Sequence, residues 1–88
     1  MNSLSVEIIK RSCVFVMEIN DPVETLKTLS MFFKDRGIMI ETLNMHRYRD
    51  GGANLIVHCL VEKDRISRTV QLMEQLSGII KLERMDAR

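Results

Sequence analysis

The fold is decided at residues 13–22, which read CVFVMEINDP. The first part of this segment is rich in β-branched and aromatic side chains, which is typical of a strand, and Asn20-Asp21-Pro22 then breaks the strand. Apolar side chains occupy both alternating sets of positions in the strand. We therefore expect a strand that is covered on both faces for much of its length.

A helix is predicted from about Pro22 to Arg36, directly after the break. Asp21 is placed to cap its first turn, Glu24 in that turn complements the helix dipole, and Gly37 is a natural terminator. Residues at helical spacing form its apolar face: Val23, Leu26, Leu29, Ser30 and Phe33.

Two strands joined by a hairpin are expected next. The first runs from Ile38 to Arg49, and its alternation shifts between Ile40 and Leu43, which indicates a bulge. Asp50-Gly51-Gly52 is a strong hairpin signal. The return strand spans residues 53–62, with one face made of Leu55, Val57, Cys59 and Val61.

The last third of the chain predicts a second helix and a fourth strand. Asp64 is a plausible N-cap, and the helix closes near Ser77-Gly78. Its apolar positions are Ile66, Val70, Met73 and Leu76. Residues 79–85 then form the final strand, while residues 4–9 extend the first strand or form a short separate one.

The element order βαββαβ predicts an α+β, ferredoxin-like fold. Right-handed crossovers place two helices on one face of a four-stranded antiparallel sheet in the order 4-1-3-2. We expect one domain over residues 12–86, with residues 1–11 as an N-terminal extension or the start of the first strand. The other sheet face carries Glu18, His58 and Leu60, and it is too apolar to be wholly solvated, so we expect something to cover it.

Composition excludes several classes of function. Apolar residues make up 45% of the 88 residues and charged residues 28%, which argues against disorder, and the net charge of +1 removes the attraction that nucleic-acid binding needs. No apolar run approaches the roughly 20 residues of a membrane span, and no signal peptide is visible. We expect a cytoplasmic protein with no nucleic-acid or membrane partner, in which Cys13 and Cys59 are buried reduced thiols.

This chain carries no sequence motif that indicates catalysis. It has no nucleophile motif, no CxxC and no phosphate-binding loop, so we expect no catalytic residues and no enzyme activity. His46 lies across the predicted hairpin from about residues 56–58, where it could neighbour His58. A metal site would need further ligands, so we expect no metal ligand and no cofactor held by this chain.

The turn at residues 17–22 and the segment 36–43, which reads RGIMIETL, resemble the ACT domain. More closely, they resemble the small regulatory subunit of acetolactate (acetohydroxyacid) synthase, in the short form typified by isozyme II. That family carries an Asn-x-Pro-Gly-x-Leu turn followed, after a helix, by Arg-Gly-Phe-Asn-Ile-Glu-Ser-Leu. The resemblance covers about residues 12–86, and it implies a non-catalytic subunit of branched-chain amino-acid biosynthesis. Its partner, the catalytic subunit, would hold thiamine diphosphate, Mg²⁺ and FAD.

The resemblance also implies an amino-acid effector site at a dimer interface. The positions that match as candidate lining are Asn20, Asp21, Leu26 and Ile40, whereas Val23, Glu24 and Met39 stand where the family has proline, glycine and asparagine. Glu24 adds bulk and negative charge beside the place of a bound carboxylate, so the site is expected to bind valine weakly or not at all.

Two further expectations concern partners. An apolar, partly uncovered sheet needs a cover, which favours a homodimer joined edge to edge. Tyr48 and Leu60 are candidates for contact with the catalytic subunit. The alternative to a regulatory subunit is a stand-alone ACT module that binds a small amino acid and signals through dimerisation. An RNA-binding module of the same element order is disfavoured, because residues 55–61 contain no aromatic side chain for base stacking.

Overall fold

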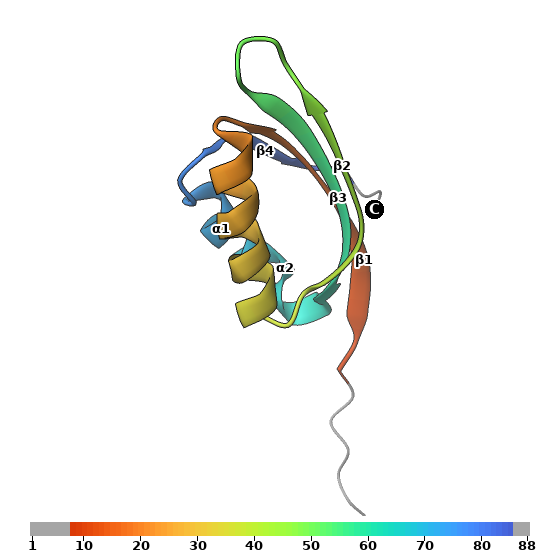
Figure 1. Cartoon of the computed structure of the whole chain (residues 1–88). Helices are drawn as coiled ribbons and strands as arrows, with labels where there is room; N and C mark the ends of the chain where they lie inside the picture. The colour runs from red at the N-terminus through yellow and green to blue at the C-terminus, as the bar shows by residue number, and fades with distance from the viewer. Residues whose placement is uncertain (1–7, 86–88) are drawn as a thin grey trace, which may run out of the picture.

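The computed structural model describes residues 8–85. Its four strands form one antiparallel sheet in the order β2-β3-β1-β4, and Figure 1 shows both helices on one face of that sheet. The elements are β1 (Lys10–Ile19), α1 (Pro22–Asp35), β2 (Met39–Arg47), β3 (Ala53–Glu62), a 3₁₀ turn (Lys63–Arg65), α2 (Ile66–Glu74) and β4 (Ile79–Arg84). The predicted fold class and strand order are confirmed.

The first strand begins close to the start of the described residues. β1 begins at Lys10, two residues before the expected start of the domain, and Ile8 and Ile9 precede the strand. The expectation of a strand at residues 4–9 otherwise lies outside the described residues. Neither helix of the described part is long and apolar enough to cross a membrane.

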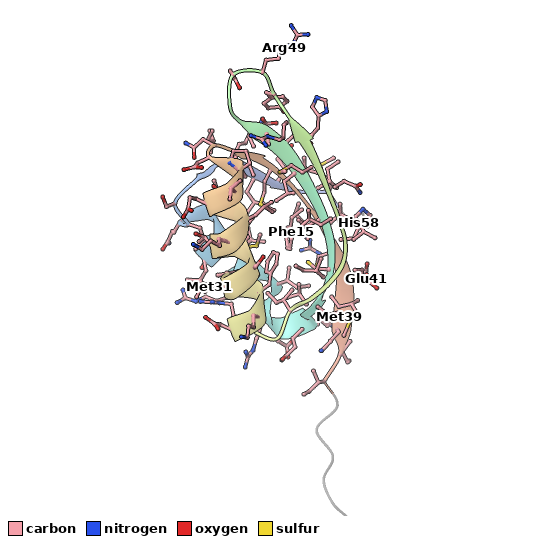
Figure 2. All side chains as sticks on the ribbon, in the orientation of Figure 1. Phe15, Met31, Met39, Glu41, Arg49 and His58 are labelled. Atoms are coloured by element: carbon pink, nitrogen blue, oxygen red, sulfur yellow. The ribbon has the colours of Figure 1, made fainter. Side chains whose placement is uncertain are left out.

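The core lies between the helices and the inner face of the two central strands, β1 and β3. The inner side chains of β1 are almost completely excluded from water: Cys13, Phe15, Met17 and Ile19. Figure 2 shows Phe15 between the sheet and α1, with His58 pointing to the other side. Cys13 pairs with Cys59 in the strand register, and both side chains are buried, as the sequence indicated.

The buried face of α1 differs from the expected one. Val23 is 66% exposed and Leu26 is only partly buried, whereas the buried residues are Pro22, Thr25, Leu29, Phe32 and Phe33. The face is rotated because the Thr25 hydroxyl is satisfied locally: it donates to the Asn20 carbonyl at 2.6 Å, so a polar residue can point inward at no cost in lost hydrogen bonds. Phe32 then brings a larger apolar surface to the core than the exposed Ser30 could.

Neither predicted helix cap uses its side chain. Asp21 occupies the N-cap position of α1, but its backbone is left-handed, with φ 45° and ψ 67°, and its side chain makes no capping hydrogen bond. A residue whose side chain caps a helix normally has an extended backbone, and the left-handed backbone of Asp21 differs from that conformation. Asp64 lies inside the 3₁₀ turn, so α2 begins at Ile66 with Arg65 as its N-cap residue.

The hairpin and the bulge follow the sequence. The β2–β3 register shifts between Ile40 and Thr42, and the Gly52 amide donates to the Asp50 carboxylate at 3.0 Å in the connecting turn. The expectation that His46 neighbours His58 is wrong. The register places His46 opposite Asn54 and His58 opposite Thr42, because the hairpin is centred on Asp50 and not on Gly51. Residues 8–85 hold no cluster of three or more metal-ligating side chains.

A hydrogen-bonded cluster ties the hairpin to the outer sheet face. The Tyr48 hydroxyl donates to the Glu18 carboxylate at 2.9 Å, and the Asn54 side-chain amide donates to the same carboxylate at 3.1 Å. The hydrogen bond to Glu18, with some desolvation and the negative charges of Glu18 and Asp50, raises the pKa of Tyr48 above its ordinary value.

The Tyr48 pKa gives a direct test of this cluster. Tyr48 is the only tyrosine and the chain has no tryptophan, so tyrosinate absorbance reports one group. We expect it to titrate above pH ~10, and Glu18→Gln to bring the midpoint back towards 10. The neutral phenol is the favoured form in the folded state. The stability from this pair is therefore present below the unfolded-state pKa and is lost as pH rises through the folded-state pKa.

Glu41→Gln is the matched control for the titration, because it removes an exposed carboxylate at the opposite end of β2 from the hairpin (Figure 2). It should leave the midpoint unchanged. Equal midpoints for wild type and Glu18→Gln would contradict the role of the Glu18 carboxylate.

Candidate functional site

The junction between β1 and α1 encloses a polar cavity of about 200 Å³. It lies where the N-terminal end of α1 meets the turn between α2 and β4 (Figure 1). The lining residues are Asn20, Asp21, Glu24, Thr25, Thr28, Ser77 and Gly78. We call this the turn cavity.

Two hydrogen bonds and one close approach shape the turn cavity. The Asn20 amide donates to the Gly78 carbonyl at 2.9 Å, and the Thr25 hydroxyl donates back to the Asn20 carbonyl. Gly78 has φ +97°, and a Cβ built there would overlap the Thr25 hydroxyl and lie 3.1 Å from the Thr25 Cβ. The site therefore needs a glycine at this position both for its backbone conformation and for the close approach of α1.

The electrostatics of the turn cavity are acidic. Asp21 and Glu24 bring two carboxylates, and the other polar side chains of the lining are uncharged: Asn20, Thr25, Thr28 and Ser77. The helix N-terminus contributes only about half a positive charge, and Pro22 has no N–H to donate. Two negative charges outweigh that dipole, so the cavity favours an ammonium or hydroxyl group over a carboxylate.

The structure brings some of the predicted effector residues together and separates others. Asn20, Asp21 and Glu24 line the turn cavity. Val23 points away into solvent, and Leu26 packs against the core.

Met39 and Ile40 lie at the start of β2, beyond the other end of α1. The 14 residues of α1 span about 20 Å, so Met39 and Ile40 cannot reach the turn cavity of their own chain (Figures 1 and 2).

The sequence interpretation missed four residues of the turn cavity: Thr25, Thr28, Ser77 and Gly78. Ser77 and Gly78 were read only as the end of a helix. Thr25 and Thr28 lie one and two turns into α1, beside the acidic first turn. Thr25 lies three residues after Pro22 and four before Leu29, so it shares their face of the helix. This spacing was the one sign in the sequence that the Thr25 hydroxyl faces inward.

β2 presents a second surface of interest. It is an edge strand, and Leu43 and Met45 pair with the buried Val57 and Leu55, so they face the helix-covered side of the sheet. Yet Leu43 is 40% exposed and Met45 is 37% exposed, because the two helices do not extend over this edge. The strand therefore combines an open edge with an uncovered apolar strip.

The two residues proposed for contact with a catalytic subunit lie far apart. Tyr48 sits at the hairpin and Leu60 near the other end of β3, so about eight residues, or roughly 25 Å, separate them. Leu60 belongs to a half-buried apolar patch on the outer sheet face, the outer patch, which is formed by Val14, Val16, Ile56 and Leu60. Tyr48 is instead engaged by Glu18.

Comparison with solved structures identifies the architecture. The ACT domain of GTP pyrophosphokinase from Chlorobium tepidum superposes with a TM-score of 0.71 at 13% identity, over 88% of this chain and 100% of that domain. The C-terminal domain of MgtC from Mycobacterium tuberculosis gives 0.67 at 10% identity, over 96% and 94% of the two chains. A homoserine dehydrogenase from Thiobacillus denitrificans gives 0.69 at 14% identity, over 89% of this chain and 17% of the enzyme.

These structural likenesses show that the chain has the fold of an ACT domain. No protein-family model matches the sequence, and the search of curated proteins found no match.

Two glycine substitutions test the packing at the turn cavity. Gly78 and Gly51 have almost the same positive φ, +97° and +100°, but a Cβ at Gly51 would meet nothing within 4 Å. We expect Gly51→Ala to lower the free energy of unfolding by about 1–2 kcal/mol through backbone strain alone. Gly78→Ala should cost about 1–3 kcal/mol more, because α1 must move away from the β4 turn. Urea denaturation measures both, and equal costs would show that the Thr25 contact is unimportant.

Proposed function

We propose that this protein is a non-catalytic regulatory subunit that binds the catalytic subunit of an acetolactate synthase and activates or stabilises it, in branched-chain amino-acid biosynthesis. One observation carries the proposal. The segments that resemble the family, residues 17–22 and 36–43, fall at the β1–α1 junction and at the start of the edge strand of an ACT fold. In the family these two places form the effector site and the dimer interface.

The cofactors of the reaction are assigned to the partner. Thiamine diphosphate and FAD need cavities well above the 200 and 240 Å³ of the two described here, since sites for drug-sized ligands measure roughly 300–1,000 Å³. The donor set that Mg²⁺ requires is likewise not gathered within residues 8–85. The residues present thus suit a subunit that acts by contact.

A homodimer through β2 is part of the proposal. Pairing two β2 strands would satisfy both open edges and let each copy cover the other's Leu43 and Met45. The same arrangement gives Met39 and Ile40 of one copy the opportunity to approach the turn cavity of the other, which one chain alone does not allow.

Substitution at the two sheet edges tests the dimer. We expect a dimeric mass at micromolar concentration in sedimentation analysis, and Leu43→Lys should weaken association at least tenfold by placing a charge in the apolar strip. Ile80→Lys is the matched control, since Ile80 is a 67% exposed aliphatic residue on the opposite edge strand, β4. A monomeric wild-type protein, or equal effects of the two variants, would contradict pairing through β2.

Weak valine feedback follows from the charges in the turn cavity. A bound valine would bring its carboxylate towards Asp21 and Glu24, and like charges about 4 Å apart repel by on the order of 1–4 kcal/mol between water and the protein surface. Removing Glu24 should therefore strengthen the binding of an amino acid by about fivefold or more.

Reconstitution with a catalytic subunit tests the function. We expect the two proteins to co-purify and acetolactate formation to rise several-fold, with little inhibition by valine.

Leu60→Glu should reduce activation through the outer patch, whereas Ile80→Glu should not. Glu24→Gln should introduce measurable valine binding by calorimetry, while Glu74→Gln, an exposed substitution outside the cavity, should not. The function is wrong if the catalytic subunit neither binds nor responds.

The ACT fold supports one alternative, a stand-alone ACT module that binds a small amino acid and signals through dimerisation. The same calorimetry distinguishes the regulatory subunit from the stand-alone module. Tight binding of valine, leucine or isoleucine to the isolated wild-type protein, lost on substitution of Asp21, would favour the stand-alone module and overturn weak feedback.

A further inference from the structure

A second cavity, of about 240 Å³, lies at the end of the molecule opposite the turn cavity. Here the C-terminal end of α1, the start of β2, the end of β3 and the start of α2 come together (Figure 1). Its apolar wall comes from Val61 of β3, Leu72 of α2, and Ile38 in the segment between α1 and β2. Ile38 and Val61 are nearly or fully buried, so this wall is continuous with the core.

The rim of this cavity is strongly basic. Arg36, Arg65 and Arg68 all line it, and Glu62 is the one acidic residue among the lining residues, which leaves a formal charge of +2. Glu62 approaches Arg65 at only 3.6 Å, and their side chains are 35% and 66% exposed, so this pair neutralises little of the positive charge. Arg11 pairs with Val61 in the strand register and adds a further positive charge on the same side of the sheet.

Arg36 is held in place before any ligand arrives. Its guanidinium lies 4.0 Å from the centre of the Phe32 ring, and one of its N–H groups donates to the Phe32 carbonyl at 3.4 Å. Stacking on an aromatic face and a backbone hydrogen bond both restrict the side chain. A guanidinium carries five N–H donors, so donors are left over for an anion, and these contacts have already reduced part of the side chain's freedom.

We infer that this cavity is a binding site for a small organic carboxylate with an apolar body. The arginines supply charge-assisted hydrogen bonds to a carboxylate, and the apolar wall takes a short hydrocarbon chain. An amino acid fits less well, because its ammonium group would face the same arginines. The site is thus opposite in charge preference to the acidic turn cavity, and about 20 Å of α1 separates the two.

The size of the cavity limits the ligand. Hexanoate has about eight heavy atoms, which need on the order of 240 Å³ at the ~30 Å³ that each water molecule takes in the liquid. Inorganic phosphate would leave the apolar wall in contact with water, and a nucleotide would not fit. Hexanoate is therefore the probe. Analogues that change its carboxylate end or its hydrocarbon chain test the arginines and the apolar wall separately.

Titration of the isolated protein, followed by amide chemical shifts, tests the site. We expect hexanoate to bind with a millimolar dissociation constant and to shift the amides of Ile38, Val61 and Leu72. Norleucine, which adds only an ammonium group, and hexylammonium, which replaces the carboxylate, should each bind at least about fivefold more weakly. Acetate should bind weakly for lack of a chain. No hexanoate binding at tens of millimolar, or equal binding of norleucine, overturns the inference.

Charge variants locate the site. Arg68→Gln should weaken hexanoate binding by about five- to tenfold, while Glu62→Gln should tighten it by about two- to fivefold, a gain that loss of folding cannot imitate. Arg49→Gln is the matched control: it removes the same charge from the hairpin at the far end of the molecule (Figure 2) and should change binding by less than about twofold. Equal effects of Arg68→Gln and Arg49→Gln overturn the inference.

The inference does not rest on the proposed partner. Hexanoate binding is measured on this chain alone, so its failure leaves the regulatory function untouched, and failure of reconstitution with a catalytic subunit leaves this site untouched.

Discussion

β1 is hydrogen-bonded to β3 along its whole length and to β4 over its second half, and its inner side chains are excluded from water. A chain of this size can bury only one such layer, so both helices must cover the inner face of β1 and β3. This requirement also fixes where the two cavities lie. α1 is placed by its contacts with the core, and its two ends then define the two cavities.

The two ends of the helical layer have opposite electrostatic character. Asp21 and Glu24 stand at the start of α1, and Arg36 stands at its end, where Arg65 and Arg68 join it from the start of α2. Acidic residues early and basic residues late in a helix complement its dipole, so the segregation also stabilises α1. The two cavities therefore favour ligand groups of opposite charge.

The edge strand β2 keeps apolar side chains that the rest of this small domain does not cover. Two helices suffice to cover the central strands, and the apolar side chains of β2 on the same face stay partly in water. Such a surface is a liability for aggregation unless something covers it. A second copy of the chain, as proposed above, is the simplest cover.

The sequence by itself determined the order of the elements, the hairpin at Asp50-Gly51-Gly52 and the bulge after Ile40, because turn chemistry and alternation are local properties of the chain. It also placed three of the turn-cavity residues. Only the tertiary structure decided which face of α1 is buried, the left-handed backbone of Asp21, and the contact between Thr25 and Gly78. The contact between Thr25 and Gly78, like the meeting of Arg36 with Arg65 and Arg68, joins residues that are far apart in the sequence, so local sequence patterns do not reveal it.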